Sequence, residues 1–387
     1  MASICRRISP LSVAVFLGIV LPVTGAHAEV KIGLILSLTG PAASIGIPYE
    51  NGVAVAIERI PEIAGEKLKL ITLDDASDPS TAARDARKLI EQDNVDIILG
   101  SAGAPASLAA ANVAYESKVP MIILAPAVMK PNQQDWEVTV VQPMSMMIAG
   151  VVNHMKEHSI TTVAFIGFND AAGDVVYDAL TRSAAPAGIK VVTDQRYGRT
   201  DTSVMAQVLK IIASQPQAVL TGGSGTPGAL SHLTLAERGY SGATYSSPAS
   251  TNKDFLRLAG AAVNGMIIPA GPFVVFEQLP DNNPIKQAAA AFKSAWLKVN
   301  GEWTNDAFAA YGYDGWLIMS DAVKRAAGKG RPGTPEYRQA LRDALYQTTE
   351  LAGAQAIYNF RPGSPYGADE RSRVIVQWQT DRFKLVQ

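Results

Sequence analysis

The sequence predicts an α/β protein of two doubly wound parallel-sheet lobes joined by a multi-strand hinge. Two observations lead to this expectation. Short apolar runs alternate with helical patterns through short connections, and this alternation occurs twice along the chain. Beyond the first 28 residues, 359 of the 387 remain, which is enough for about two domains.

The first residues have the pattern of a cleaved export signal. Arg6 and Arg7 give a positive start, residues 11–23 are almost entirely apolar, and Ala26-His27-Ala28 is a small-x-small cleavage pattern. The apolar run is too short to span a bilayer. We therefore expect residues 1–28 to be a signal peptide and the mature protein to be periplasmic.

Composition excludes several kinds of function. The single cysteine, Cys5, lies in the expected signal, so the mature chain can form no disulfide. Removal of the signal takes away two arginines and no acid, which changes the formal charge from −1 to −3 and argues against a nucleic-acid partner. His154 and His158 have a spacing that can chelate zinc, but no H-E-x-x-H motif surrounds them. We expect neither a metal nor a cofactor.

The first series of elements begins with the mature chain. The expected strands are Val30–Leu36, Lys67–Leu73, Asp96–Leu99 and Met121–Leu124. The expected helices are Pro48–Ile60, Pro79–Gln92 and Pro105–Ser117. In the second of these, Asp78 is a suitable N-cap and proline occupies the first helical position.

The alternation then starts again. The expected strands are Thr162–Gly167, Lys190–Tyr197 and Ala218–Leu220, and the expected helices are Asp174–Ala184, Thr202–Ser214 and Gly228–Arg238. Helices at Asn283–Val299, Asn305–Ala327 and Pro335–Tyr346 and strands near Ala356–Phe360 and Ser372–Trp378 complete the chain.

Two mixed extended stretches, Trp136–Pro143 and Met266–Pro272, are suited to crossing between the lobes. They divide the chain into two discontinuous units. The N-terminal ligand-binding lobe is expected to hold residues 29–141 and 271–350, and the C-terminal ligand-binding lobe to hold residues 142–270 and 351–387.

Ligands of parallel α/β sheets bind outside the carboxyl ends of the strands. The loops there are 37–46, 100–105 and 125–129 in the first lobe and 168–174 and 221–228 in the second. Loop 100–105 is short, has small residues and opens into a helix, so its backbone N–H groups either cradle a carboxylate or serve packing alone. Loop 221–228 lacks the Lys-Ser/Thr ending of a P-loop, and no set of catalytic side chains is evident. We expect no enzyme.

Several of these segments also match a known family. They are Leu36–Pro41, Leu73–Asp75 with Asp78-Pro79, Ile98–Ser101, Val119–Ile122, Asp201-Thr202, Leu235–Tyr240 and Tyr313–Gly315. Together they make the mature chain resemble the periplasmic Leu/Ile/Val-binding proteins of ABC transporters over nearly its whole length. The resemblance implies a type I periplasmic binding protein, whose two lobes close on a solute and deliver it to permease subunits in the inner membrane.

The ligand positions depart from the amino-acid pattern of that family. The resemblance places Ala104 at a hydroxyl position, Met129 at a threonine, Ile45 at an aromatic residue and Ala172 at a tyrosine. Ala249 stands where an acid pairs with the α-ammonium group. A buried ammonium without a counter-charge costs several kcal/mol.

The sequence therefore predicts a monomeric receptor for a small hydrophobic or aromatic carboxylate that needs no amino group. Two alternatives stay open: a branched-chain amino-acid binding protein, in which Asp170 or Asp174 contacts the ammonium, and a sensory receptor for a similar ligand. The residues expected to bind the ligand are Ser44, Ile45, Ser101, Ala102, Gly103, Ala104, Ala127, Val128, Met129, Asn169, Ala172, Gly223, Ser224, Ser247 and Ala249.

Overall fold

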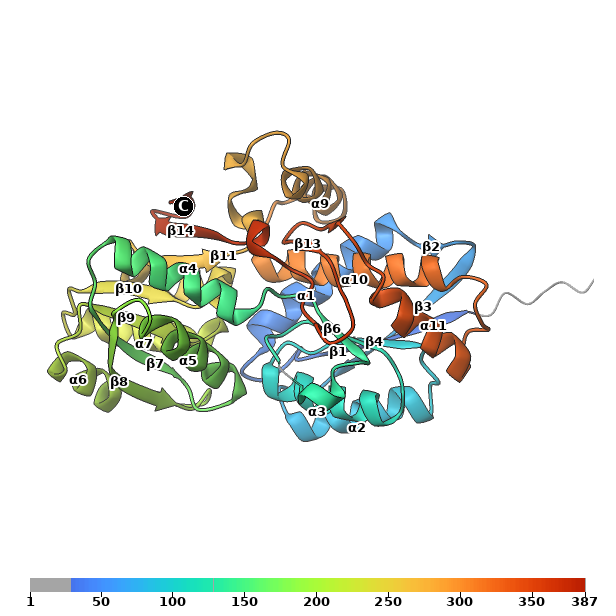
Figure 1. Cartoon of the computed structure of the whole chain (residues 1–387), viewed down its shortest axis with the longest axis horizontal. Helices are drawn as coiled ribbons and strands as arrows, with labels where there is room; N and C mark the ends of the chain where they lie inside the picture. The colour runs from blue at the N-terminus through green and yellow to red at the C-terminus, as the bar shows by residue number, and fades with distance from the viewer. Residues whose placement is uncertain (1–28, 128, 387) are drawn as a thin grey trace, which may run out of the picture.

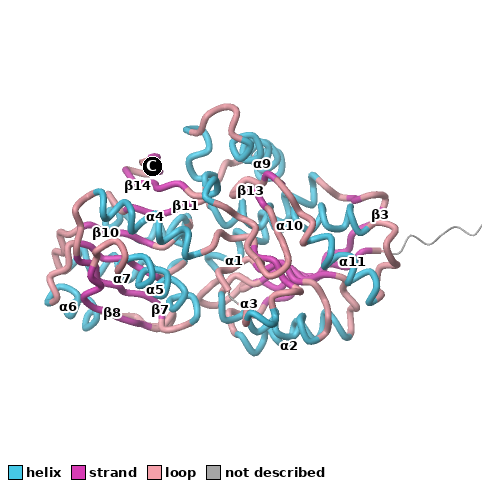
Figure 2. Tube along the Cα trace, viewed as in Figure 1, coloured by secondary structure: helices cyan, strands magenta, loops and turns pink. Residues whose placement is uncertain are grey.

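The computed structural model describes residues 29–127 and 129–386, which form two lobes (Figure 1). The expected signal peptide lies outside the described residues. Each lobe has one large sheet with helices on its faces (Figures 1 and 2). The predicted fold class is confirmed.

The first sheet has the strand order β2-β3-β1-β4-β5-β6. Its strands are β1 (Val30–Leu36), β2 (Glu62–Ile63), β3 (Glu66–Asp74), β4 (Ile97–Gly100), β5 (Met121–Ile123) and β6 (Glu137–Thr139). Strand β1 pairs in parallel with β3 and β4, and the pairing continues in parallel to β6. Only the short edge strand β2 is antiparallel to its neighbour.

The second sheet has the order β15-β14-β11-β10-β9-β7-β8. Its strands are β7 (Thr162–Phe168), β8 (Lys190–Tyr197), β9 (Ala218–Gly222), β10 (Ala243–Ser246), β11 (Ile267–Ala270), β14 (Val374–Gln379) and β15 (Arg382–Leu385). The strands from β8 to β11 are parallel, and β14 returns antiparallel to β11. A separate pair is formed by β12 (Leu351–Ala352) and β13 (Ile357–Tyr358).

The helices connect these strands and cover the sheets. They are α1 (Ala43–Arg59), α2 (Pro79–Glu91), α3 (Ala104–Glu116), α4 (Met144–Glu157), α5 (Ala171–Ala184), α6 (Met205–Ala213), α7 (Gly225–Glu237), α8 (Lys253–Ala259), α9 (Pro284–Asn300), α10 (Ala307–Ala326) and α11 (Pro335–Leu345). The Asp78 carboxylate accepts from the Thr81 N–H at 2.7 Å, so this predicted N-cap of α2 is confirmed.

Helix α1 begins at Ala43, five residues before the predicted start at Pro48. Proline has no N–H to donate to the carbonyl four residues earlier, which is that of Ser44. The freed Ser44 carbonyl instead accepts from the Asn252 side chain at 2.8 Å. A partner from the second lobe therefore satisfies the backbone group that Pro48 leaves unpaired.

The expected crossing at 136–143 is shorter in the structure. Residues Glu137–Thr139 form β6, which pairs with β5, and only the residues after it cross to α4. Likewise, Ile267–Ala270 form β11 within the second sheet. Extended apolar residues look alike in sequence whether they pair or cross, so the pattern did not separate the two.

The C-terminal segment contacts the first lobe before it reaches the second. The buried Asp314 carboxylate on α10 accepts the N–H groups of Ala354 at 2.7 Å and Gln355 at 2.8 Å, and the Tyr358 hydroxyl at 2.9 Å. Farther along, Tyr366 forms a β-bridge with Thr139. The sequence-based division assigned all of 351–387 to the second lobe, whereas only the part from Val374 onward joins the second sheet. The lobe boundaries themselves stay predictions.

Helices α1 and α10 pack backbone to backbone at two glycines. A Cβ at Gly52 would overlap the Ala309 carbonyl oxygen, and one at Gly312 would overlap that of Tyr49. The first-lobe core around α10 depends on this close approach.

We predict that Gly312→Ala lowers the free energy of unfolding by about 3 kcal/mol, because the two backbones must move apart. The matched control is Gly315→Ala on the same helix, where a Cβ meets side-chain methyl groups and no backbone, the nearest being a Leu124 methyl at 2.9 Å. Alanine favours the helix there, so we expect a change below about 1 kcal/mol. Urea unfolding measures both, and equal losses in the two variants would contradict this account.

Glu137 is buried in β6, and its Oε1 has no hydrogen-bond partner among the described residues. Burial raises the pKa of this carboxyl to about 8, whereas the unfolded chain titrates near the ordinary value of 4.5. The stability that protonated Glu137 contributes to the fold is therefore fully present below the unfolded-state pKa of 4.5. It is lost as the pH rises from there towards the folded-state pKa of about 8.

Glu137→Gln keeps the shape of the side chain and cannot ionise. We predict that its melting temperature relative to the unchanged protein rises steadily from pH 5 to pH 8. Glu116→Gln, an exposed change in the same lobe, is the control and should show no such trend. Melting curves across this pH range decide the matter, and a constant difference would disprove ionisation of Glu137.

Candidate functional site

A cavity lies between the two lobes, at the carboxyl ends of the parallel strands of both sheets. Both lobes contribute to its mostly apolar wall. The lining residues are Ile45, Tyr49, Ala102, Gly103, Ala104, Pro126, Val141, Gln142, Met144, Ala172, Val176, Arg199, Gly222, Gly223, Ser224, Ser247, Pro248, Ala249, Phe308 and Tyr311.

Nine of the predicted ligand-binding residues lie in this lining. They are Ile45, Ala102, Gly103, Ala104, Ala172, Gly223, Ser224, Ser247 and Ala249. They follow strands β1, β4, β7, β9 and β10. The structure thus brings together the strand ends that the topology rule indicated.

Three other predicted ligand-binding residues lie outside the lining, and their side chains or carbonyl groups make contacts within the first lobe or with Tyr366. The Ser101 hydroxyl donates to the Asp75 carboxylate inside the first lobe. Met129 is 3% exposed and packs in the core around α3, so it widens no part of the cavity. Ala127 is buried in the same core, and its carbonyl accepts from Tyr366 at 3.3 Å.

The remaining predicted residues also lie outside the lining. Asn169 has an exposed side chain, and its N–H donates to the Tyr197 carbonyl at 3.0 Å. Ser44 lies at a contact between the lobes, where its hydroxyl oxygen accepts from the Thr226 N–H at 3.1 Å. Val128 lies outside the described residues.

Among the described residues that line the cavity, Arg199 alone carries a charge. It follows β8 and holds its guanidinium over the Phe168 ring, 4.2 Å from the centroid. Its Nε donates to the Asp170 carboxylate at 2.6 Å, and its Nη1 to the Ser224 hydroxyl at 3.3 Å. Since a guanidinium has five N–H groups, donors remain for an anion in the cavity.

Two helices begin at the cavity without a side-chain cap. Gly103 is the N-cap residue of α3 and has no side chain to cap it, and Ser224 is the N-cap residue of α7 and its hydroxyl makes no capping bond to that helix. Uncapped helix starts present N–H groups and a partial positive charge. At α7 the Thr226 N–H already donates to the Ser44 hydroxyl and Pro227 has no N–H, so the Gly225 N–H is the one that this first turn offers to a ligand. The two helix starts come from opposite lobes, so an anion between them is favoured from both sides.

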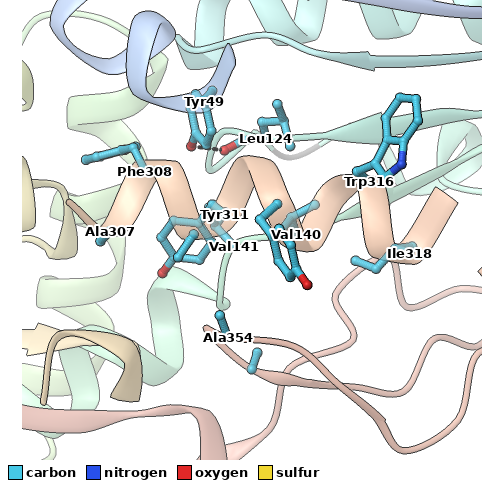
Figure 3. Close-up of a cluster of buried hydrophobic side chains, with 14 of the residues drawn as sticks. Tyr49, Leu124, Val140, Val141, Ala307, Phe308, Tyr311, Trp316, Ile318 and Ala354 are labelled. Atoms are coloured by element: carbon cyan, nitrogen blue, oxygen red, sulfur yellow. Dashed lines mark hydrogen bonds between the residues drawn. The ribbon is translucent and has the colours of Figure 1, made fainter. Parts of the chain in front are cut away.

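The hinge side of the cavity is lined by hydroxyl and amide groups. The Tyr49 hydroxyl donates to the Leu124 carbonyl, and the Tyr311 hydroxyl donates to Gln142 Oε1. Figure 3 shows Tyr49, Phe308, Tyr311 and Val141 around the start of α10. Burial raises the pKa of both tyrosines well above the ordinary value, so both stay protonated.

Near the cavity the lobes are joined by hydrogen bonds around Asn252. The Asn252 amide donates to the Asp306 carboxylate at 3.0 Å as well as to the Ser44 carbonyl. The same carboxylate accepts the Lys253 N–H at 2.8 Å. Burial raises the pKa of Asp306 to about 6. Gly225 is needed at this contact, because its φ is +59° and a Cβ would lie 2.6 Å from the Ser44 hydroxyl.

Sequence reasoning missed Arg199, Tyr49, Gln142, Phe308 and Tyr311. Arg199 had a signal, since a cation two residues after a predicted strand lies at the edge where ligands bind. Phe308 and Tyr311 are three apart, a spacing that puts two aromatic rings on one helix face. Tyr49 and Gln142 carried no signal, because one lies within a helix and the other on a crossing.

The two histidines with chelating spacing lie away from the cavity. His154 Nδ1 is 3.0 Å from the Tyr245 hydroxyl, and the His158 ring stacks on that of His154. Across residues 29–127 and 129–386, no group of three His, Cys, Asp or Glu side chains is placed to hold a metal ion. In the same residues no helix is long and apolar enough to cross a membrane.

Comparisons with known proteins agree with this architecture. A family model described as periplasmic binding protein matches residues 29–382. "Leu/Ile/Val-binding protein homolog 7" of Brucella suis is 24% identical over 98% of this chain and 96% of its own length. "Leu/Ile/Val-binding protein BraC3" of Rhizobium johnstonii is 25% identical over 92% of this chain and 94% of its own.

Solved structures are similar over the same length. An extracellular ligand-binding receptor from Rhodopseudomonas palustris has 36% identity and a TM-score of 0.88, covering 93% of this chain and 99% of its own. A second receptor, from R. palustris HaA2, has 35% identity and a TM-score of 0.89, covering 93% and 100%. LivJ of Streptococcus pneumoniae, solved with isoleucine, shares the fold at 18% identity and a TM-score of 0.76, covering 92% and 99%.

The family match spans nearly all the described residues, and the two receptors from R. palustris share the fold over 93% of this chain. The chain therefore belongs to the periplasmic binding protein family, within the type I group that includes the Leu/Ile/Val-binding proteins.

Proposed function

We propose that this protein is the periplasmic receptor of an ABC-type importer and binds a hydrophobic or aromatic carboxylate that needs no amino group. The observation that carries the proposal is Arg199, the single charged residue in an otherwise mostly apolar lining. A pocket with one charged anchor and apolar walls suits a ligand with one carboxylate and a hydrophobic body.

No acid is found among the described residues that line the cavity, and this argues against an amino acid as the ligand. Ala249 lines the cavity at the position where the family resemblance implies an acid. The two candidate substitutes are engaged elsewhere. Asp170 caps α5 through the Ala172 N–H at 2.9 Å and pairs with Arg199. Asp174 has a side chain 69% exposed and pairs with Arg196.

A carboxylate between the lobes has donors on both sides. On the first lobe they are the N–H groups at the start of α3, and on the second they are Arg199 and the Gly225 N–H at the start of α7. Charge-assisted bonds of this kind are about twice as strong as neutral ones. We further propose that the protein delivers the solute to permease subunits, and its similarity to relatives with Leu/Ile/Val-binding names supports this role.

A ligand panel tests the proposal directly. We predict that cinnamate and 3-phenylpropanoate raise the melting temperature of residues 29–387, and that leucine, isoleucine and phenylalanine do not. Ligands that bind the folded state alone stabilise it in proportion to the logarithm of their concentration. Stabilisation by leucine with none by the aromatic acids would reject the proposal and restore the branched-chain amino-acid alternative.

Replacement of the anchor gives a sharper test. We predict that Arg199→Gln weakens binding of the aromatic acid about 100-fold, because the carboxylate loses its charged partner. The matched control is Arg196→Gln on β8, three residues before Arg199, which removes pairs with Asp174 and Asp194 outside the cavity. Titration calorimetry should give the control an unchanged affinity. Equal loss in both variants would remove Arg199 from the site.

A further inference from the structure

The hinge side of the cavity has a hydrogen-bonding character opposite to that of the Arg199 side. The Tyr49 and Tyr311 hydroxyls each give their one proton to a protein oxygen, those of Leu124 and Gln142. Each hydroxyl oxygen can therefore only accept a hydrogen bond from a molecule in the cavity.

Gln142 likewise has no N–H group left to donate to a ligand. Its Nε2 donates both protons, one to the Gln355 carbonyl at 3.1 Å and one to the Ser372 carbonyl at 3.0 Å. Its Oε1 already accepts the Tyr311 hydroxyl, and this oxygen can accept a second hydrogen bond but can donate none. Tyr49, Gln142 and Tyr311, which we call the acceptor end, thus present oxygen lone pairs and no proton.

The acceptor end and Arg199 lie at opposite sides of the cavity. Arg199 follows β8, the outer strand of the second sheet, and β7, β9 and β10 separate it from β11 on the hinge side. Gln142 bonds to the crossing residues Gln355 and Ser372 on that hinge side. A ligand that reaches from Arg199 to the acceptor end therefore meets hydrogen-bond donors at one of its ends and hydrogen-bond acceptors at the other.

A charged amine is a poor match for this end. Asp306 caps the start of α10 and Asp314 lies within this helix, and both carboxylates are already bonded within the protein. Asp306 accepts from Asn252, Lys253 and Phe308, and Asp314 accepts from Ala354, Gln355 and Tyr358. Neither lines the cavity. A neutral donor such as a hydroxyl group fits three acceptors without a need for counter-charge.

We infer that the acceptor end is a subsite for a hydroxyl group at the far end of the ligand from its carboxylate, as in a 4-hydroxylated aromatic acid. The inference rests on the proposed function for the carboxylate end. It also places the ligand hydroxyl on Gln142, the residue that ties the crossing after β6 to the two C-terminal crossing residues.

The test compares acids that differ at the ring position alone. We expect 4-hydroxycinnamate to bind residues 29–387 at least about tenfold more tightly than cinnamate, because an unpaired acceptor is left behind without the hydroxyl. The methyl ether, 4-methoxycinnamate, has no proton to donate and should lose this advantage. Calorimetric affinities for the three acids provide the measurement.

A variant pair locates the effect. Tyr311→Phe removes one acceptor and frees no donor, so the preference for the hydroxylated acid should fall to about threefold or less. Tyr337→Phe is the control, since it deletes an equally buried hydroxyl that lies outside the cavity and has no partner among the described residues. It should keep the full preference.

The outcomes separate this inference from the proposed function. Equal affinity for all three acids would overturn the hydroxyl subsite and leave the carboxylate receptor intact. A preference that survives unchanged in Tyr311→Phe would also overturn it. Failure of every acid to bind would reject the proposed function, and the subsite with it.

Discussion

The buried face of helix α10 fixes how the two lobes meet. Three polar residues at its start and along its first turns each hold a different segment. Asp306 binds the second lobe through Asn252, Tyr311 binds the crossing after β6 through Gln142, and Asp314 binds the C-terminal crossing through two backbone N–H groups. The helix can take this role because Gly52 and Gly312 let α1 and α10 approach backbone to backbone. Burial raises the pKa of Asp314 to about 7, and its three donors are what make that burial tolerable.

Pro48 illustrates how a local irregularity creates a long-range contact. Within α1 it leaves the Ser44 carbonyl without its helical donor, and a buried carbonyl must find another. The Asn252 amide supplies it, and the other acceptor of that amide is Asp306. A proline that looked like the beginning of a helix is thus the reason for an interlobe hydrogen bond. The same contact brings Ser44 to the N–H of Thr226, which explains why a predicted ligand residue became a lobe contact.

The sequence predicted the helices and strands whose apolar residues recur with a clear period. It did not predict which way a loop side chain points or which extended segments pair within a sheet. The strands β1, β4, β7 and β9 and the helices after them follow from alternation, and the rule for strand ends then located nine lining residues. Ser101 and Met129 were assigned to the ligand because their loops are right, yet their side chains turn into the first lobe. Loop position is visible in a sequence, but side-chain direction is not. Tyr49 and Tyr311 were missed for the complementary reason, since they reach the cavity from within helices.

The distribution of donors has a consequence for how a ligand would act on the fold. On the proposed assignment, a carboxylate takes N–H groups of α3 from the first lobe and Arg199 from the second. Neither lobe alone provides both sets, and transfer of a carboxylate from water to an apolar wall is unfavourable without them. A ligand shifts a conformational equilibrium only by its difference in affinity for the two states. That difference exists here because the full set of partners is assembled only when the lobes meet. Before a ligand binds, the ion pair with Asp170 keeps the Arg199 guanidinium oriented. An anion that enters the cavity then adds a partner to an arginine that is already in place.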